Sequence, residues 1–148
     1  DRYAGAILAG SVHMARHEPE FEAFVRANKA ALERMPTALL SVSLSMAGAE
    51  SAHASPEDRE RALKSVDGLV RSFFERTGWS PDRVLPVAGA LAYSRYAAPT
   101  RLVMKVIARL NHADTDTSTN HTYTDWHALD RFVESFCRAP TPSAERPG

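Results

Sequence analysis

Three short apolar runs give the clearest pattern along this chain, and each has about the length of a buried β-strand. They cover Ala4–Leu8, Thr37–Leu44 and Val84–Leu91. None of them alternates regularly between polar and apolar residues, as a strand with one face in water would. The pattern therefore predicts three strands that are covered on both faces, which is typical of a parallel sheet.

Helical patterns separate these runs. Apolar residues recur at helical spacing through Glu18–Met35. A longer helix is predicted to begin at Ser55, an N-cap serine that is followed by a proline and acidic residues, and to end near Gly78. A last helix is predicted from Thr124 onward, whereas Ala47–Ser55 is rich in small residues and predicts a flexible insertion.

The alternation of strands and helices predicts an α/β fold with a doubly wound parallel sheet and right-handed crossovers. Ligands bind to such sheets at the carboxyl ends of the strands. Here those ends fall at Gly10–Met14, Ser43–Gly48 and Gly89–Tyr96, which read as loops of small or polar residues. We therefore expect a ligand cleft at that edge, although three strands make a narrow sheet for this class of fold.

Composition narrows the function classes. The 148 residues suffice for one domain, which we expect over residues 1–138, followed by a disordered, proline-rich tail over 139–148. The 18 Lys and Arg residues balance 18 Asp and Glu residues, which argues against a general nucleic-acid-binding protein. The single cysteine, Cys137, excludes a disulfide framework and favours a reducing, cytosolic compartment. No apolar run approaches the ~20 residues of a membrane-spanning helix.

The stretch Pro99–Leu110 predicts a helix with one basic side. Arg101, Lys105 and Arg109 follow one another at four-residue spacing, and apolar residues fill most of the remaining positions. Two interpretations stay open. Either the helix packs within the protein with its charges toward water, or it lies as a basic amphipathic helix on an anionic membrane surface.

Metal and nucleophile chemistry have weak support in the sequence. His13 and His17 have the spacing of a metal-binding pair, but no third ligand is evident nearby and the segment reads as a loop. The stretch Asp114–Thr117 lacks the glycine and the final glutamate of a calcium-binding loop. Cys137 has no base beside it that would make it a nucleophile. We therefore expect no metal site, and surface or cofactor-adjacent positions for the two histidines.

Aromatic residues cluster after the third apolar run, where Tyr93 and Tyr96 flank a serine and Arg95. They either cover a planar ligand at the strand ends or pack within the fold. Neither of the common glycine-rich phosphate-binding patterns occurs in the sequence. The residues alone therefore predict an α/β domain with a cleft for a planar ligand.

Five segments, in order along the chain, carry a resemblance to a known family: YAGAILAGSVHMARH (Tyr3–His17), MPTALLSVSL (Met35–Leu44), GWSPDRVLPVAGALAYSRY (Gly78–Tyr96), DTDTS (Asp114–Ser118) and YTDWHALDRF (Tyr123–Phe132). Over residues 1–137 the chain resembles the flavodoxin-like, quinone-dependent protoporphyrinogen oxidase family of bacteria. The most specific part of the resemblance begins with PDR at 81–83 and AGAL at 88–91 and continues with Tyr93, Arg95 and Tyr96. The TDT and YTDW motifs follow it.

This resemblance implies a flavodoxin-like domain that binds FMN on a parallel sheet with strand order 2-1-3-4-5. It implies an enzyme that oxidises protoporphyrinogen IX to protoporphyrin IX in haem synthesis and passes electrons through FMN to a membrane quinone. It also implies a peripheral protein on the cytoplasmic face of the inner membrane. Whether the protein forms an oligomer stays open. Arg101, Lys105 and Arg109 would then face the anionic membrane surface, or the propionates of the porphyrin.

The resemblance also implies where the site lies, because loops at the strand ends hold the flavin ring in flavodoxin-like proteins. Carried onto this chain, the cofactor contacts are expected at Ser11, Val12, His13, Met14, Ser43, Leu44, Ser45, Gly89, Ala90, Leu91 and Tyr93. Tyr93 and Arg95 are expected to contact the substrate, and no catalytic acid or base is assigned. Ala92 stands where the family often carries arginine. The identity of the substrate therefore depends on whether that arginine is needed to bind the porphyrin.

The family pattern begins with a first strand, a phosphate-binding loop rich in Ser and Thr, a helix and a second strand. We expect these elements, about 40–50 residues, to be absent from the chain, which would open at the third strand with an unpaired edge. Two alternatives to the enzyme therefore stay open. One is a flavodoxin-like electron carrier or FMN reductase with another partner, and the other is a non-catalytic, truncated remnant.

Overall fold

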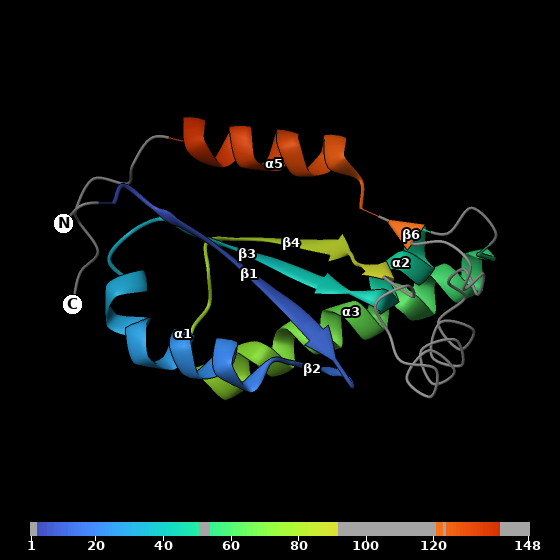
Figure 1. Ribbon diagram of the computed structural model, residues 1–148, viewed down its shortest axis with the longest axis horizontal. Coiled ribbons are helices and arrows are strands. Elements are labelled where there is room, and N and C mark those ends of the chain that lie inside the picture. Colours follow the sequence, from blue (N-terminus) through green and yellow to red (C-terminus); the bar gives the residue numbers. More distant parts are fainter. Residues whose placement is uncertain (1–2, 51–53, 92–120, 123, 140–148) are drawn as a thin grey trace.

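Three parallel strands form the centre of the fold in the computed structural model, which describes residues 3–50, 54–91, 121–122 and 124–139 (Figure 1). These strands are β1 (Ala6–His13), β3 (Thr37–Ser43) and β4 (Arg83–Ala88). Their parallel pairing confirms the predicted α/β sheet. A short strand that the sequence does not predict, β2 (Arg16–His17), pairs antiparallel with the end of β1, so the order is β2-β1-β3-β4.

Helices cover both faces of this sheet. α1 (Pro19–Leu32) and α3 (Pro56–Thr77) lie side by side on one face, and α5 (Trp126–Arg138) lies over the opposite face (Figure 1). At the carboxyl end of the sheet, α2 (Leu44–Glu50) packs against α3 and β4. This layering is consistent with the flavodoxin-like class of fold.

The helix ends follow the chemistry that the sequence predicts. The Ser55 hydroxyl accepts a hydrogen bond from the Asp58 backbone N–H at 3.1 Å, and α3 stops where Gly78 adopts the left-handed conformation with φ of 63°. The Asp125 carboxylate accepts a hydrogen bond from the Ala128 N–H at 2.9 Å, which begins α5. The predicted start and end of α3 are therefore confirmed, and α5 begins at Trp126, two residues after the predicted Thr124.

The main core lies between the sheet and the α1–α3 pair. Its largest members, Leu39, Phe73 and Trp79, are at most 1% exposed. The ring of Phe21, on α1, lies directly on the backbone of β1 at Gly10. A Cβ atom at Gly10 would clash with that ring, so this position has no room for a side chain while the ring stays in place.

Two segments differ from the sequence prediction. The sequence predicts a loop over Gly10–Met14, but β1 continues to His13 because the hairpin strand β2 pairs with it. The sequence also predicts a flexible insertion from Ala47, but this residue lies within α2. The Ser43 hydroxyl accepts a hydrogen bond from the Met46 N–H at 3.2 Å, and three small residues of α2 are buried where the helix packs on α3.

Several predicted features lie outside the described residues. They are the basic helix Pro99–Leu110 with Arg101, Lys105 and Arg109, the cluster of Ala92, Tyr93, Arg95 and Tyr96, the stretch Asp114–Thr117, and the tail over 140–148. The described strands β5 (Ala90–Leu91) and β6 (His121–Thr122) flank this part of the chain and pair with each other antiparallel. Among the helices that the structure describes, none is both long and apolar enough to cross a membrane.

Candidate functional site

The carboxyl ends of β1, β3 and β4 meet at one edge of the sheet. The register aligns Ser11 with Val42, one residue before Ser43. Gly89 follows the end of β4, and its backbone N–H donates to the Ser43 carbonyl at 3.1 Å. The expected cofactor contacts at the ends of these three strands are therefore brought to the same edge, as parallel pairing requires.

A tight hairpin extends this edge beyond β1. Met14 and Ala15 form its turn, and both have positive φ angles, of 49° and 61°. Asn and Gly favour such turns, so these two residues hold a conformation that costs on the order of 1 kcal/mol each. The Met14 side chain is 98% exposed. The hairpin therefore presents an apolar side chain to solvent beside the strand ends.

The two histidines of the hairpin lie in different environments. His13 is exposed, and its Nε2 lies 3.2 Å from a carboxylate oxygen of Glu18. His17 is fully buried, and its Nε2 lies 3.0 Å from the Ser41 hydroxyl. Burial, and then the charge of Arg76, lowers the pKa of His17. The expected surface or cofactor-adjacent position is therefore wrong for His17, which is a core residue. Within the described ranges, no three potential metal ligands lie together.

The start of α2 supplies the second expected group of cofactor contacts. Leu44 and Ser45 lie in its first turn rather than in a loop, because the Ser43 hydroxyl caps the helix. The Ser43 side chain is only 3% exposed. At the other end of α2, burial and then the charge of Asp125 raise the pKa of Glu50. Glu50 is thus a carboxyl group near this edge that holds a proton more readily than usual.

A buried carboxylate on α1 supports the hairpin through Arg16. The sequence patterns do not point to this residue. Glu22, on α1, has a fully buried side chain within hydrogen-bond distance of two guanidinium groups, those of Arg16 and Arg76. A guanidinium nitrogen of Arg26, on the same helix, lies 3.7 Å from a carboxylate oxygen of Glu22. The hydrogen bond from Arg16 is the largest of the effects that lower the pKa of Glu22, to about 2, against the opposing effect of burial. The available signal was an acid inside the apolar stripe of a predicted helix.

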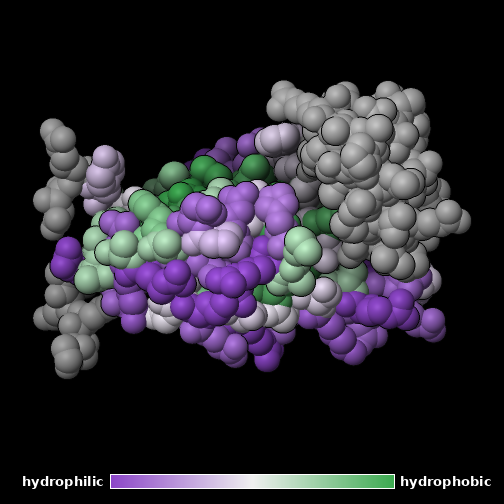
Figure 2. Space-filling view, turned by 60° about the horizontal axis from the view of Figure 1, so that its bottom comes forward, coloured by the Kyte–Doolittle hydropathy of each residue, from purple (hydrophilic) through white to green (hydrophobic). Residues whose placement is uncertain are grey.

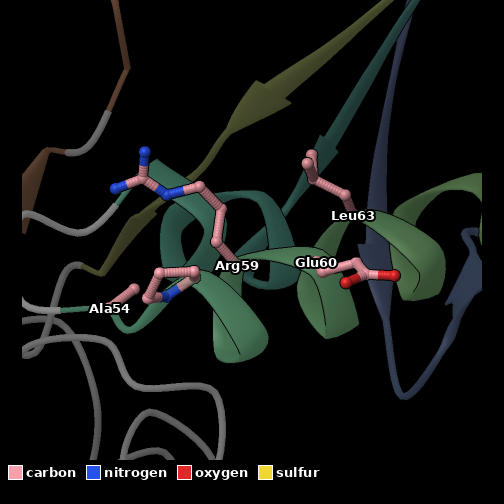
Figure 3. A pocket seen from close by; sticks show the side chains of 5 residues that line it. Ala54, Arg59, Glu60 and Leu63 are labelled. Atoms are coloured by element: carbon pink, nitrogen blue, oxygen red, sulfur yellow. The ribbon is translucent and has the colours of Figure 1, made fainter.

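A shallow hollow lies where α3 begins (Figure 3). Its volume is about 400 Å³, and its lining residues are Ala54, Pro56, Arg59, Glu60 and Leu63. Arg59 and Leu63 rise from the same side of the helix (Figure 3). Leu63 is 47% exposed, so the hollow offers an apolar surface with a guanidinium group at its rim. Sequence patterns gave no indication of it.

The described edge fits the ring of a flavin better than its phosphate. An exposed apolar side chain at Met14, together with backbone groups at three strand ends, suits a flat aromatic ring. A phosphate is usually held by a loop at a helix N-terminus, with free backbone N–H groups. In the described ranges, the helix that starts at this edge is α2, and the Ser43 hydroxyl occupies one of its first N–H groups.

Similarity to known proteins covers most of the chain. Residues 1–118 match the flavodoxin domain family. A protein of Escherichia coli strain K12, named protoporphyrinogen IX dehydrogenase (quinone), is 30% identical over 133 residues, which cover 90% of this chain and 68% of that protein. A Leishmania major protein of the same name is 30% identical over 145 residues, 98% of this chain and 58% of that protein. No solved structure gives a significant match.

The family match extends over the three parallel strands, the hairpin and helices α1 to α3, and it agrees with the layered α/β fold. The chain therefore belongs to the flavodoxin domain family, in the group of oxidoreductases named protoporphyrinogen IX dehydrogenase (quinone).

Proposed function

We propose that this protein catalyses the FMN-dependent oxidation of protoporphyrinogen IX to protoporphyrin IX and passes the electrons to a membrane quinone. The observation that carries the proposal is the 30% identity to named dehydrogenases over 90% of the chain. The convergence of three parallel strand ends at one edge supports it, because cofactors of doubly wound sheets bind there.

The residues of the chain bind and orient the reactants in this proposal. Ser11–Met14 and Ser43–Ser45 contact the flavin ring, together with residues 89–91 and Tyr93. Bound FMN supplies the redox chemistry, as cofactors do in such enzymes. The Met14 side chain provides apolar surface for the ring. Tyr93 and Arg95 contact the substrate.

An amphiphilic substrate is compatible with the hollow at the start of α3. A porphyrinogen combines an apolar macrocycle with carboxylate side chains. Leu63 offers the hollow an apolar surface, and Arg59 a cation that can pair with a carboxylate. Replacing Leu63 with Ser and Arg59 with Gln would raise the KM for the porphyrinogen and leave the KM for the quinone unchanged, if the substrate binds there.

The acceptor requires contact with a membrane in this proposal. Arg101, Lys105 and Arg109 form one basic side of a predicted helix, and each basic group near an anionic surface contributes about 1 kcal/mol. We therefore place the protein peripherally, on the inner face of the cell membrane. Changing the three residues to Gln would reduce sedimentation with anionic vesicles, and unchanged sedimentation would contradict this placement.

The proposal is tested by mixing the purified protein with FMN and following quenching of flavin fluorescence. Protoporphyrinogen oxidation is then followed without oxygen, with a soluble quinone, through the fluorescence of the porphyrin product. We expect a rate above that of free FMN and the quinone alone. Flavin binding without faster porphyrin formation would favour an electron carrier or FMN reductase. A protein that binds no FMN would act as a non-catalytic remnant.

A further inference from the structure

The β1–β2 hairpin keeps its shape without help from its turn sequence. Its turn residues, Met14 and Ala15, both have positive φ angles, and neither residue type favours that conformation. Its return strand, β2, has only two residues, Arg16 and His17. Backbone pairing joins the two strands to each other, and the side chains of Arg16 and His17 join the hairpin to the rest of the protein.

The Arg16 contact has the geometry of a strong ion pair. Its Nε lies 3.2 Å from Oε1 of Glu22, and its Nη2 lies 2.6 Å from Oε2, so the guanidinium group spans both carboxylate oxygens. The Glu22 side chain is fully buried and Arg16 is half-exposed, so water screens the attraction less than it would between two exposed groups. His17 adds a second anchor through its contact with the Ser41 hydroxyl on β3.

Glu22 in turn is fixed to the body of the protein. It lies on α1, and Nε of Arg76, near the end of α3, donates to its Oε1 at 2.8 Å. Arg26 also approaches the carboxylate, at 3.7 Å, but from α1 itself. Arg16 and Arg26 are similarly exposed, at 50% and 46%, and share one carboxylate. Only Arg16 ties the hairpin to it, which makes Arg26 a matched control.

We infer that the Arg16–Glu22 pair holds the tip of the hairpin, His13 and Met14, in the position that the flavin ring requires. Arg16 and Glu22 are then positioning residues that act through the hairpin. The inference rests on the proposed function, because it takes Ser11–Met14 as part of the cofactor site. Its first consequence concerns the hairpin alone and can be measured without any flavin.

The first experiment compares Arg16→Gln and Arg26→Gln by hydrogen exchange of the unliganded protein. The reporter is the hairpin, including the Glu18 amide, which donates to the Ser11 carbonyl at 3.2 Å. We expect Arg16→Gln to speed exchange there by about tenfold and Arg26→Gln to leave it near wild type, because only Arg16 restrains the hairpin. Equal protection in Arg16→Gln and wild type would overturn the inference.

The second experiment measures the FMN dissociation constant and the flavin midpoint potential of the same variants. We expect Arg16→Gln to weaken binding by about tenfold, or about 1.4 kcal/mol, and to shift the potential, whereas Arg26→Gln changes neither. Arg16→Lys keeps the charge but loses the two-pronged contact, so partial loss is expected. Full rescue by lysine would overturn the positioning role, because charge alone would then suffice.

The outcomes separate this inference from the proposed function. If wild type binds FMN and Arg16→Gln binds it equally well, the inference fails and the proposed function stands. If no variant binds FMN but Arg16→Gln exchanges faster, the proposed function fails and the restraint on the hairpin is supported. The double variant with Glu22→Gln and Arg16→Gln is expected to exchange no faster than Glu22→Gln, because Glu22→Gln alone already breaks the ion pair with Arg16.

Discussion

The two faces of the sheet are covered to different degrees. On the face under α1 and α3, Leu8 and Leu39 are 8% and 0% exposed and belong to one cluster with Phe73. Successive side chains of a strand point to opposite faces, so Ala9 and Leu40 point toward α5. Leu40 is only half-buried and Ala9 is exposed. No residue of α5 is buried.

The difference lies in how the helices meet the sheet. α1 and α3 turn most of their apolar residues inward, with Phe24 and Leu63 as exposed exceptions, and the surface that they show to solvent is mostly hydrophilic (Figure 2). α5 lies near β4, where Arg83 donates to the Ser135 hydroxyl at 2.8 Å. Its apolar stripe stays half-buried; the members are Leu129, Phe132, Val133 and Phe136. The α1–α3 face therefore contributes most of the packing energy of the described part of the chain.

The largest expected loss of stability comes from removing a buried ring from the well-covered face. Phe73→Ala removes a ring with no exposed surface that contacts His17, Phe21 and Trp79. We expect the free energy of unfolding to fall by about 3–5 kcal/mol, which urea denaturation measures. A loss below about 1 kcal/mol would contradict the assignment of stability to this face.

Lowering the pH is expected to reduce the stability of the folded protein through Glu22, the carboxylate on α1 that pairs with the hairpin. The pKa of Glu22 is about 2 in the folded protein and 4.5 when unperturbed. A carboxylate with a lowered pKa stabilises the folded state above its unfolded pKa and loses that effect as pH falls through its folded pKa. Stability should therefore fall between about pH 4.5 and 2, by at most about 3 kcal/mol.

The pH dependence is measured by urea denaturation of wild type and Glu22→Gln across this range. The variant should lack the Glu22 part of the slope. His17, whose pKa is also lowered, destabilises both proteins as pH falls below about 6.5. Because the charge of Glu22 opposes that lowering, the destabilisation by His17 is larger in the variant than in wild type. Equal slopes for the two proteins would show that Glu22 is not the group that titrates.

A smaller effect tests the partly covered face. Phe132→Ala removes a half-buried ring from α5, so the lost burial is partial. We expect the unfolding free energy to fall by about 1–2 kcal/mol, which is smaller than the Phe73→Ala effect. An equal loss for the two substitutions would remove the distinction between the faces.

The smallest expected change in stability concerns an ion pair on the solvent-exposed side of α3. The Asp67–Arg71 pair has a contact of 2.9 Å, but its side chains are 59% and 72% exposed. Exposed pairs contribute about 0–1 kcal/mol, so Asp67→Asn should change the unfolding free energy by less than about 0.5 kcal/mol. A larger loss, measured by the same urea denaturation, would mean that the helix surface adds to the stability of this face.

Local chemistry made part of the fold predictable from the sequence. The continuous apolar runs predicted the three parallel strands, and the N-cap at Ser55 was predictable because its hydroxyl bonds to a backbone N–H only three residues later. The hairpin was not predictable in this way, because Met14 and Ala15 are not turn-forming residues. α2 was missed because its buried small residues resemble those of a flexible linker.

The same distinction applies to the candidate site: some of its residues could be placed from the sequence and others could not. Parallel pairing alone brings the ends of β1 and β3 to one edge, so Ser11 and Ser43 could be placed near each other from their positions in the strands. Glu22 could not be found in this way, since its burial depends on Arg76, 54 residues away. The role of Tyr93 and Arg95 stays a prediction.

The contact between Phe21 and Gly10 has a practical consequence for spectroscopy. The ring lies on the strand backbone one residue before Ser11, and no side chain separates the two. A fluorine atom on this ring would therefore sense small displacements of the strand end through its resonance frequency. Arrival of a ligand at the edge could thus be followed from inside the protein, with a probe that does not touch the ligand.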